Sequence, residues 1–180
     1  MTKLDAPTTM TDHYARAVNA SSLVSKPDTT HSATDVLGAH GLAAKRVPLG
    51  VALLRLFVGD NHAAGMIVNI LADKAVGKAY RLGDEIGRVE AEDMARAVLA
   101  WHRDNRCKVC GGHGLKLIPG TTTLGDEPCR PCRGSGRIPF DMNFTLMRLG
   151  LARWLAAEIE REQAKAGPAA LAALAPRLQL

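Results

Sequence analysis

The four cysteines of this 180-residue chain lie in two near-copies of one short motif. Residues 107–114 (the first knuckle) and residues 129–136 (the second knuckle) both read C-x-x-C-x-G-x-G. Eighteen residues separate the two cysteine pairs. Two thiols three positions apart can bind one metal ion from a single tight turn, and the glycines supply the positive φ angles that such a turn requires. The spacing therefore predicts one structural zinc ion in a tetrahedral shell, bound by Cys107, Cys110, Cys129 and Cys132.

Other uses of these cysteines fit the sequence less well. Two disulfides would require an oxidising compartment, yet residues 1–32 contain no apolar signal segment. A thioredoxin-like redox pair would need a βαβ context and would not explain the duplication. His102 and His113 lie near the motifs, but four thiolates already fill the shell. We therefore expect both histidines to lie outside the metal shell.

The composition favours a helical protein, and its positive net charge is compatible with nucleic-acid binding. Hydrophobic residues make up 47% of the chain and aromatic residues only 4%, with alanine and leucine prominent. The longest apolar run, residues 51–58, is interrupted by Arg55 and is too short to cross a membrane. The net charge of +5 and the pI of about 9.2 fit nucleic-acid binding without proving it.

The basic residues near the motifs are the candidate DNA contacts. Residues 101–137 hold seven Lys and Arg against three Asp and Glu, and a four-thiolate zinc centre would add two negative charges. The segment that contains the two motifs would therefore attract DNA only weakly by itself. Arginine suits phosphate and guanine because its planar fork binds two acceptors at once. We expect phosphate contacts from Arg130, Arg133 and Arg137, and positions nearer base edges for Arg148 and Arg153.

The pattern of apolar residues divides the chain into four parts. Residues 1–32 have no apolar period and predict a flexible N-terminal arm. Residues 33–105 predict a helical domain, residues 106–140 the zinc-binding ribbon, and residues 141–180 a C-terminal helix-turn-helix-like segment with a tail. Helices are expected over residues 35–45, 48–59, 61–79 and 89–104, with inward apolar stripes that include Met66, Ile67, Met94, Val98 and Trp101.

Two further local structures are expected around the ribbon. Residues 116–118 and 137–140 could pair as a short hairpin, with a loop over residues 120–125. Leu149-Gly150-Leu151 is typical of the turn in a helix-turn-helix, although an ordinary αα-hairpin is the alternative. Gly167-Pro168 is expected to end the following helix. The predicted fold class is thus mainly α, with a four-cysteine zinc ribbon and a short hairpin.

The combination of a helical N-terminal half, two knuckles and a following helix-turn-helix resembles the phage lambda Q-type late gene antitermination proteins. Residues 32–39 look like that family's entry into its first helix, and residues 76–81 look like its mid-domain segment. The spacing from there through Trp101 to Cys107 is also similar. The resemblance covers residues 32 to 166. The knuckles alone also occur in DnaJ-type co-chaperones, so the combination is the more specific feature.

The resemblance implies a bacteriophage transcription antitermination protein with no enzymatic activity. Such proteins bind promoter-region DNA and load onto host RNA polymerase, where they contact the β flap and the sigma factor and work with NusA. A cytoplasmic location in a bacterial host follows from this role. The alternatives are a DnaJ-like co-chaperone module, a simple zinc-containing DNA-binding regulator and an RNA-binding knuckle. Sequence motifs of P-loop, zincin or serine-hydrolase enzymes are absent.

Overall fold

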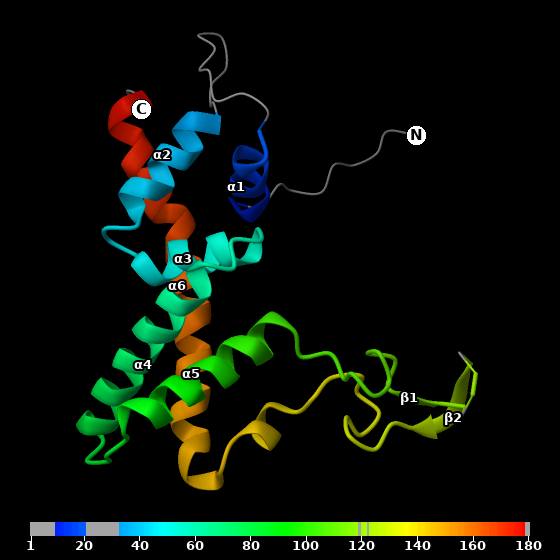
Figure 1. The fold of residues 1–180 in the computed structure, drawn as a ribbon. Coiled ribbons are helices and arrows are strands. Elements are labelled where there is room, and N and C mark those ends of the chain that lie inside the picture. The colour runs from blue at the N-terminus through cyan, green and yellow to red at the C-terminus, as the bar shows by residue number, and fades with distance from the viewer. Residues whose placement is uncertain (1–9, 21–32, 119, 122, 179–180) are drawn as a thin grey trace, which may run out of the picture. The chain divides into compact units, whose positions relative to one another are not determined.

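The structure is a computed structural model that describes residues 10–20, 33–118, 120–121 and 123–178. It is mainly helical, with one short antiparallel hairpin and the four cysteines clustered together, as the sequence predicted. No helix in the described ranges is both long enough and apolar enough to span a bilayer. The elements in chain order (Figure 1) are α1 (Met10–Val18), α2 (Ala33–Ala43), α3 (Pro48–Phe57), α4 (Ala63–Arg81), α5 (Arg88–Arg103), β1 (Leu115–Leu117), β2 (Leu124–Pro128), the 3₁₀ turn η1 (Phe140–Asn143) and α6 (Leu146–Leu178).

Helices α2 to α5 lie where the apolar periodicity predicted them. Met94 and Val98 of α5 are buried, as expected for the stripe of an amphipathic helix. Met66 is an exception, because 48% of it is exposed. The buried stripe of α4 follows a spacing of four residues through Ala63, Ile67 and Leu71, and Met66 lies about 100° around the helix from it.

The chain forms two compact units. One unit comprises Met1–Ile70 and Ala157–Leu180, and the other comprises Leu71–Ala156. Helices α4 and α6 each contribute residues to both units, because the boundaries fall inside them. These boundaries differ from the limits at 105/106 and 140/141 expected from the sequence, and the four-part division stays a prediction.

Helix α1 lies within the segment that was expected to be a flexible arm. Tyr14 and Ala17, one helical turn apart, are both buried. The Tyr14 ring lies 4.5 Å from the His40 ring of α2, and Tyr14 also packs with Leu54 and Ala166. The arm prediction is therefore wrong for residues 10–18, which form a helix that buries Tyr14 and Ala17. The rest of the predicted arm, residues 1–9 and 21–32, lies outside the described residues.

Helix α6 is one uninterrupted helix of 33 residues. The turn expected at Gly150 and the end expected at Gly167-Pro168 are both wrong. A glycine inside a helix costs only about 1 kcal/mol relative to alanine, and burial of Leu151 and Leu155 just beyond it offsets that cost. Pro168 costs about 3 kcal/mol or more in a helix interior, and the buried Ala166 and Ala170 on either side pack the helix through it.

The ribbon joins the end of α5 through the indole of Trp101. The Trp101 Nε1–H donates to the Ile138 carbonyl at 2.8 Å, and the Ile138 N–H donates to the Asn105 carbonyl at 2.8 Å. The Phe140 ring meets the Trp101 ring edge-on at 5.0 Å. The two chain segments that enter and leave the ribbon are thereby held side by side.

The hairpin within the ribbon uses a different partner from the one expected. Strand β1 pairs with β2, with Leu115 opposite Pro128 and Leu117 opposite Leu124, so part of the expected loop over residues 120–125 is strand. Arg137 instead forms an isolated bridge with Arg106. The pairing predicted between residues 116–118 and 137–140 is therefore wrong. The motif spacing alone does not determine which flanking segments meet; the hydrogen bonds between the knuckles do.

Candidate metal centre

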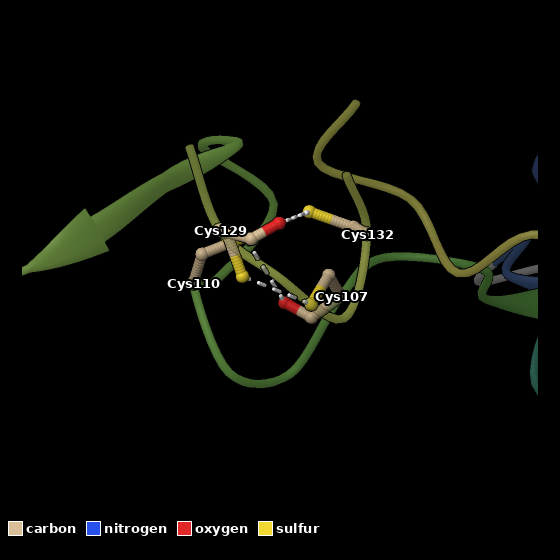
Figure 2. Close-up of side chains that lie close together, drawn as sticks. All are labelled: Cys107, Cys110, Cys129 and Cys132. Carbon is tan, nitrogen blue, oxygen red and sulfur yellow. Dashed lines mark hydrogen bonds between the residues drawn. The ribbon is translucent and has the colours of Figure 1, made fainter. Parts of the chain in front are cut away.

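The four cysteines converge from two loops, and their side chains lie close together (Figure 2). All four residues are buried, with at most 2% of any of them exposed. The Sγ atoms lie within 4.8 Å of one another, with 3.9 Å between Cys107 and Cys129 and 3.8 Å between Cys110 and Cys132. A tetrahedral shell with metal–sulfur bonds of about 2.3 Å has edges of about 3.8 Å. The predicted ligand set is therefore brought together in the geometry of a closed metal site.

The two knuckles fold in the same way, residue for residue, at an offset of 22 positions. The Gly112 and Gly134 amides donate to the carbonyls of Cys107 and Cys129 at 3.0 and 3.1 Å. One residue further on, the amides of His113 and Ser135 donate to the carbonyls of Cys110 and Cys132, both at 3.0 Å. Each knuckle is therefore a tight turn closed by its own backbone before any metal is considered.

The knuckles also exchange a reciprocal pair of hydrogen bonds. The Cys107 N–H donates to the Gly136 carbonyl, and the Cys129 N–H donates to the Gly114 carbonyl, both at 2.8 Å. Gly114 and Gly136 have φ angles of +80° and +72°, and a Cβ on them would lie 2.3 Å and 2.1 Å from the carbonyl oxygens of Gly134 and Gly112. Both glycines are thus required for backbone conformation and for close approach. The exchange brings residue 115 beside 128 and residue 106 beside 137, which explains the observed strand pairing.

The pKa values of two of the buried thiols, Cys110 and Cys129, are shifted in opposite directions because their hydrogen-bond partners differ. Burial alone would raise the pKa of the Cys110 thiol, but the amides of Gly114 and Gly112 and the neighbouring sulfurs lower it to about 7. The Gly114 N–H donates to Cys110 Sγ at 3.3 Å. For Cys129, burial and the neighbouring sulfurs raise the pKa to about 12. A metal ion would supply the positive charge that four adjacent thiolates need.

The charges around the first knuckle are largely paired. Asp104 accepts a hydrogen bond from the Arg106 Nε–H at 3.1 Å and also pairs with the Lys108 ammonium. The Lys108 and Arg106 partners hold the pKa of the Asp104 carboxyl well below its usual range. In the hairpin, Lys116 Nζ lies 3.1 Å from a carboxylate oxygen of Glu127.

The second knuckle carries charges that are not paired. Residues 128–140 contain three arginines and no acidic residue. Arg130, Arg133 and Arg137 are all exposed, and their guanidinium groups form no ion pair with any residue in the described part of the chain. Sequence analysis identified these arginines, but it missed the neutralisation of the first knuckle by Asp104. The Asp–x–Arg–x–Lys spacing of residues 104–108 was the available signal.

The other two candidate arginines lie on the first turns of α6 and are bound to carboxylates. Arg148 contacts Glu90 at 2.7 Å and Asp84 at 2.6 Å, and its side chain is only 18% exposed. It also donates to the Glu85 carbonyl at 3.0 Å. Arg153 contacts Asp141 at 2.9 Å. The Asp84 carboxylate and the Glu85 carbonyl therefore hold Arg148 at the start of α6.

Comparison with known proteins identifies no relative of this chain. No protein-family model, no curated protein and no solved structure matches the chain. His102 and His113 do not belong to the ligand cluster.

Proposed function

We propose that the chain is a zinc-stabilised DNA-binding protein that acts in transcription antitermination. The single observation that carries the DNA-binding part is the set of three unpaired, exposed arginines on the second knuckle. Arg130 and Arg133 lie in the turn that carries Cys129 and Cys132, and Arg137 directly follows the second motif. A metal ion bound by these cysteines would therefore hold the backbone of the arginines in place. Such a surface suits the phosphate backbone of a duplex.

Zinc is the metal that this site suits best. Four thiolates around one tetrahedral position favour zinc or iron among the first-row metals, and a closed shell of this kind has a structural role. Cys107, Cys110, Cys129 and Cys132 would hold the ion, which would contribute folding free energy on the order of 10 kcal/mol. The residues of the shell leave no coordination position for a substrate, so we assign the centre no catalytic step.

The antitermination role rests on the resemblance to the lambda Q-type family. A protein of this kind must bind promoter DNA first and host RNA polymerase afterwards, which requires one basic surface and one protein-binding surface. The second knuckle fits the first requirement. Exposed apolar side chains at the start of α6, Leu146 at 90% and Met147 at 86%, are of the kind found at protein interfaces. The β flap, the sigma factor and NusA are the proposed contacts, in the bacterial cytoplasm.

A purified transcription assay tests this proposal. The full-length, zinc-loaded protein is added to RNA polymerase holoenzyme on a template in which the native late promoter precedes a terminator. We expect increased read-through on this template and little effect on an otherwise identical template with an unrelated promoter. Promoter binding without read-through would instead identify a simple DNA-binding regulator. Equal read-through from both templates would identify a factor directed at RNA or at polymerase itself.

A further inference from the structure

Arg133 has a backbone conformation that side chains other than glycine rarely adopt. Its φ angle is +52°, and it is the one non-glycine residue with a positive φ in the described part of the chain. The equivalent position in the first knuckle is Gly111, with a φ of +61°. The same turn therefore exists in this molecule with the residue that suits it, and folding alone does not explain an arginine there.

The position of Arg133 is fixed by its neighbours. It follows the ligand Cys132 directly, and it precedes Gly134, whose amide closes the turn on the Cys129 carbonyl at 3.1 Å. The Arg133 amide donates to the Arg130 carbonyl at 3.2 Å. The side chain itself is exposed and forms no ion pair with the described residues. The backbone of Arg133 is thus held in place, while its guanidinium group can contact a partner molecule.

A fixed backbone position matters more for an arginine that contacts a base than for one that contacts a phosphate. A phosphate contact positions the protein on the duplex but carries no sequence information, and any backbone phosphate within reach can serve. A bidentate contact to the O6 and N7 atoms of guanine requires the planar fork to arrive in one orientation. Among the other candidates for such a contact, Arg148 and Arg153 are already bound to carboxylates.

We propose that Arg133 determines DNA sequence specificity by contacting a base edge in the major groove, with guanine as the favoured base. Arg130 and Arg137 contact the flanking phosphates, and the first knuckle serves to build the metal centre. This inference rests on the proposed DNA-binding function. It assigns base contact to the ribbon, in place of the two arginines at the start of α6.

The test begins with the wild-type, full-length, zinc-loaded protein and a library of randomised 20-base-pair duplexes. Dissociation constants are then measured for the selected duplex and for a scrambled duplex of equal length. Arg133→Lys keeps the charge and removes the planar fork. Arg130→Lys is the matched control on the same knuckle. A second variant, Arg133→Gly, restores the residue found at the equivalent position of the first knuckle, and its zinc content shows that the ribbon still folds.

For Arg133→Lys we expect the preference for the selected duplex to fall roughly 5- to 150-fold, the ratio that one bidentate base contact supplies. Binding to the scrambled duplex and its salt dependence should stay the same, whereas Arg130→Lys should keep the preference. Arg133→Gly should bind zinc normally, lose the same preference and weaken binding to both duplexes. An unchanged preference in both Arg133 variants would overturn the inference and leave the proposed function standing. Failure of the wild-type protein to bind any duplex would overturn the proposed function itself.

Discussion

The two knuckles share one backbone and differ in what they expose. Both close their turns with the same pair of hydrogen bonds, and each donates one amide to the other. The first knuckle has a lysine paired with Asp104 and a glycine at position 111, whereas the second has exposed arginines at the equivalent positions 130 and 133. The positions that repeat thus maintain the arrangement of the four thiols, whereas the positions that differ determine which charges each knuckle exposes.

The divergence extends to the last turn of each knuckle. The Ser135 hydroxyl donates to the Cys132 carbonyl at 2.6 Å and accepts from the Arg137 amide at 3.2 Å. The equivalent residue in the first knuckle is His113, whose side chain is exposed. The second knuckle therefore has an additional side-chain brace beneath Arg137, which is consistent with a role in positioning that arginine.

Loss of one metal ligand should have the largest effect, and it should be equal in the two knuckles. Cys107→Ser and Cys129→Ser should each remove the metal and with it folding free energy on the order of 10 kcal/mol. Metal content of the purified variants, together with circular dichroism, measures the outcome. Retention of one zinc per chain by either variant would contradict a shell made of all four thiols.

Substitution of Gly114 or Gly136, whose carbonyls accept the hydrogen bonds between the knuckles, should have the next largest effect on stability. Gly114→Ala and Gly136→Ala should each cost about 2–4 kcal/mol, because each combines a positive φ with overlap against a carbonyl oxygen of the other knuckle. Gly120→Ala is the matched control, since Gly120 has a φ of +78° and, apart from its chain neighbours, no described residue has an atom within 4 Å of the added methyl group. It should cost only about 1 kcal/mol. Equal losses in all three variants, measured by denaturant unfolding, would show that the close approach is unimportant.

Exchanging the residues at the equivalent positions 111 and 133 should change stability in opposite directions. Arg133→Gly should stabilise the ribbon by about 1 kcal/mol, because glycine adopts a positive φ without steric cost. Gly111→Arg should destabilise it by a similar amount. Thermal unfolding of the zinc-loaded variants measures both. A fall in stability with Arg133→Gly would mean that the arginine supports the fold itself.

Removal of the Asp104 carboxylate should leave the cations at the first knuckle unpaired, like the arginines of the second knuckle. Asp104→Asn removes the partner of Arg106 and Lys108, and the freed cations should steepen the salt dependence of DNA binding by up to about two units. Asn at position 104 keeps the size of the side chain and is therefore a conservative change. An unchanged salt slope would place the first knuckle away from DNA.

The smallest effect concerns pH. The pKa of Asp104 is depressed in the folded protein, so its ion pairs contribute above the unfolded value near 4 and are lost only as pH falls through the lower folded value. The difference in DNA affinity between Asp104→Asn and wild type should therefore be constant from pH 6 to pH 8. A difference that disappears at pH 6 would contradict this assignment of charge.

The cysteine cluster and most helices could be predicted because their signals are local. The C-x-x-C spacing identifies the four cysteines that lie together, and the apolar stripes of α2 to α5 give the limits of these helices within a few residues. Helix α1 was missed because the residues it is seen to bury, Tyr14 and Ala17, do not make an apolar period in the sequence. The continuity of α6 was missed because Gly150 and Pro168 have local signals that tertiary packing overrides.

Contacts between distant positions could not be predicted from one sequence. The hydrogen bond from Arg148 to Glu90 joins residues 58 positions apart, and no local pattern links them. The partner of β1 is likewise decided by the hydrogen bonds that the Cys107 and Cys129 amides donate to the Gly136 and Gly114 carbonyls. Composition showed that the ribbon is basic, but only the structure showed which of its arginines are already paired.

The hydrogen bond from Trp101 to Ile138 makes the ribbon visible to fluorescence spectroscopy. The chain has two tryptophans, and the indole of Trp101 donates directly to the backbone that leaves the metal centre. The other, Trp154, lies on α6 with the Lys78 ammonium 5.6 Å from its ring. A Trp154→Phe variant would thus carry a single tryptophan, beside the ribbon, which can be excited selectively at wavelengths that tyrosine does not absorb. Its emission would follow metal uptake and release in real time, without any added label.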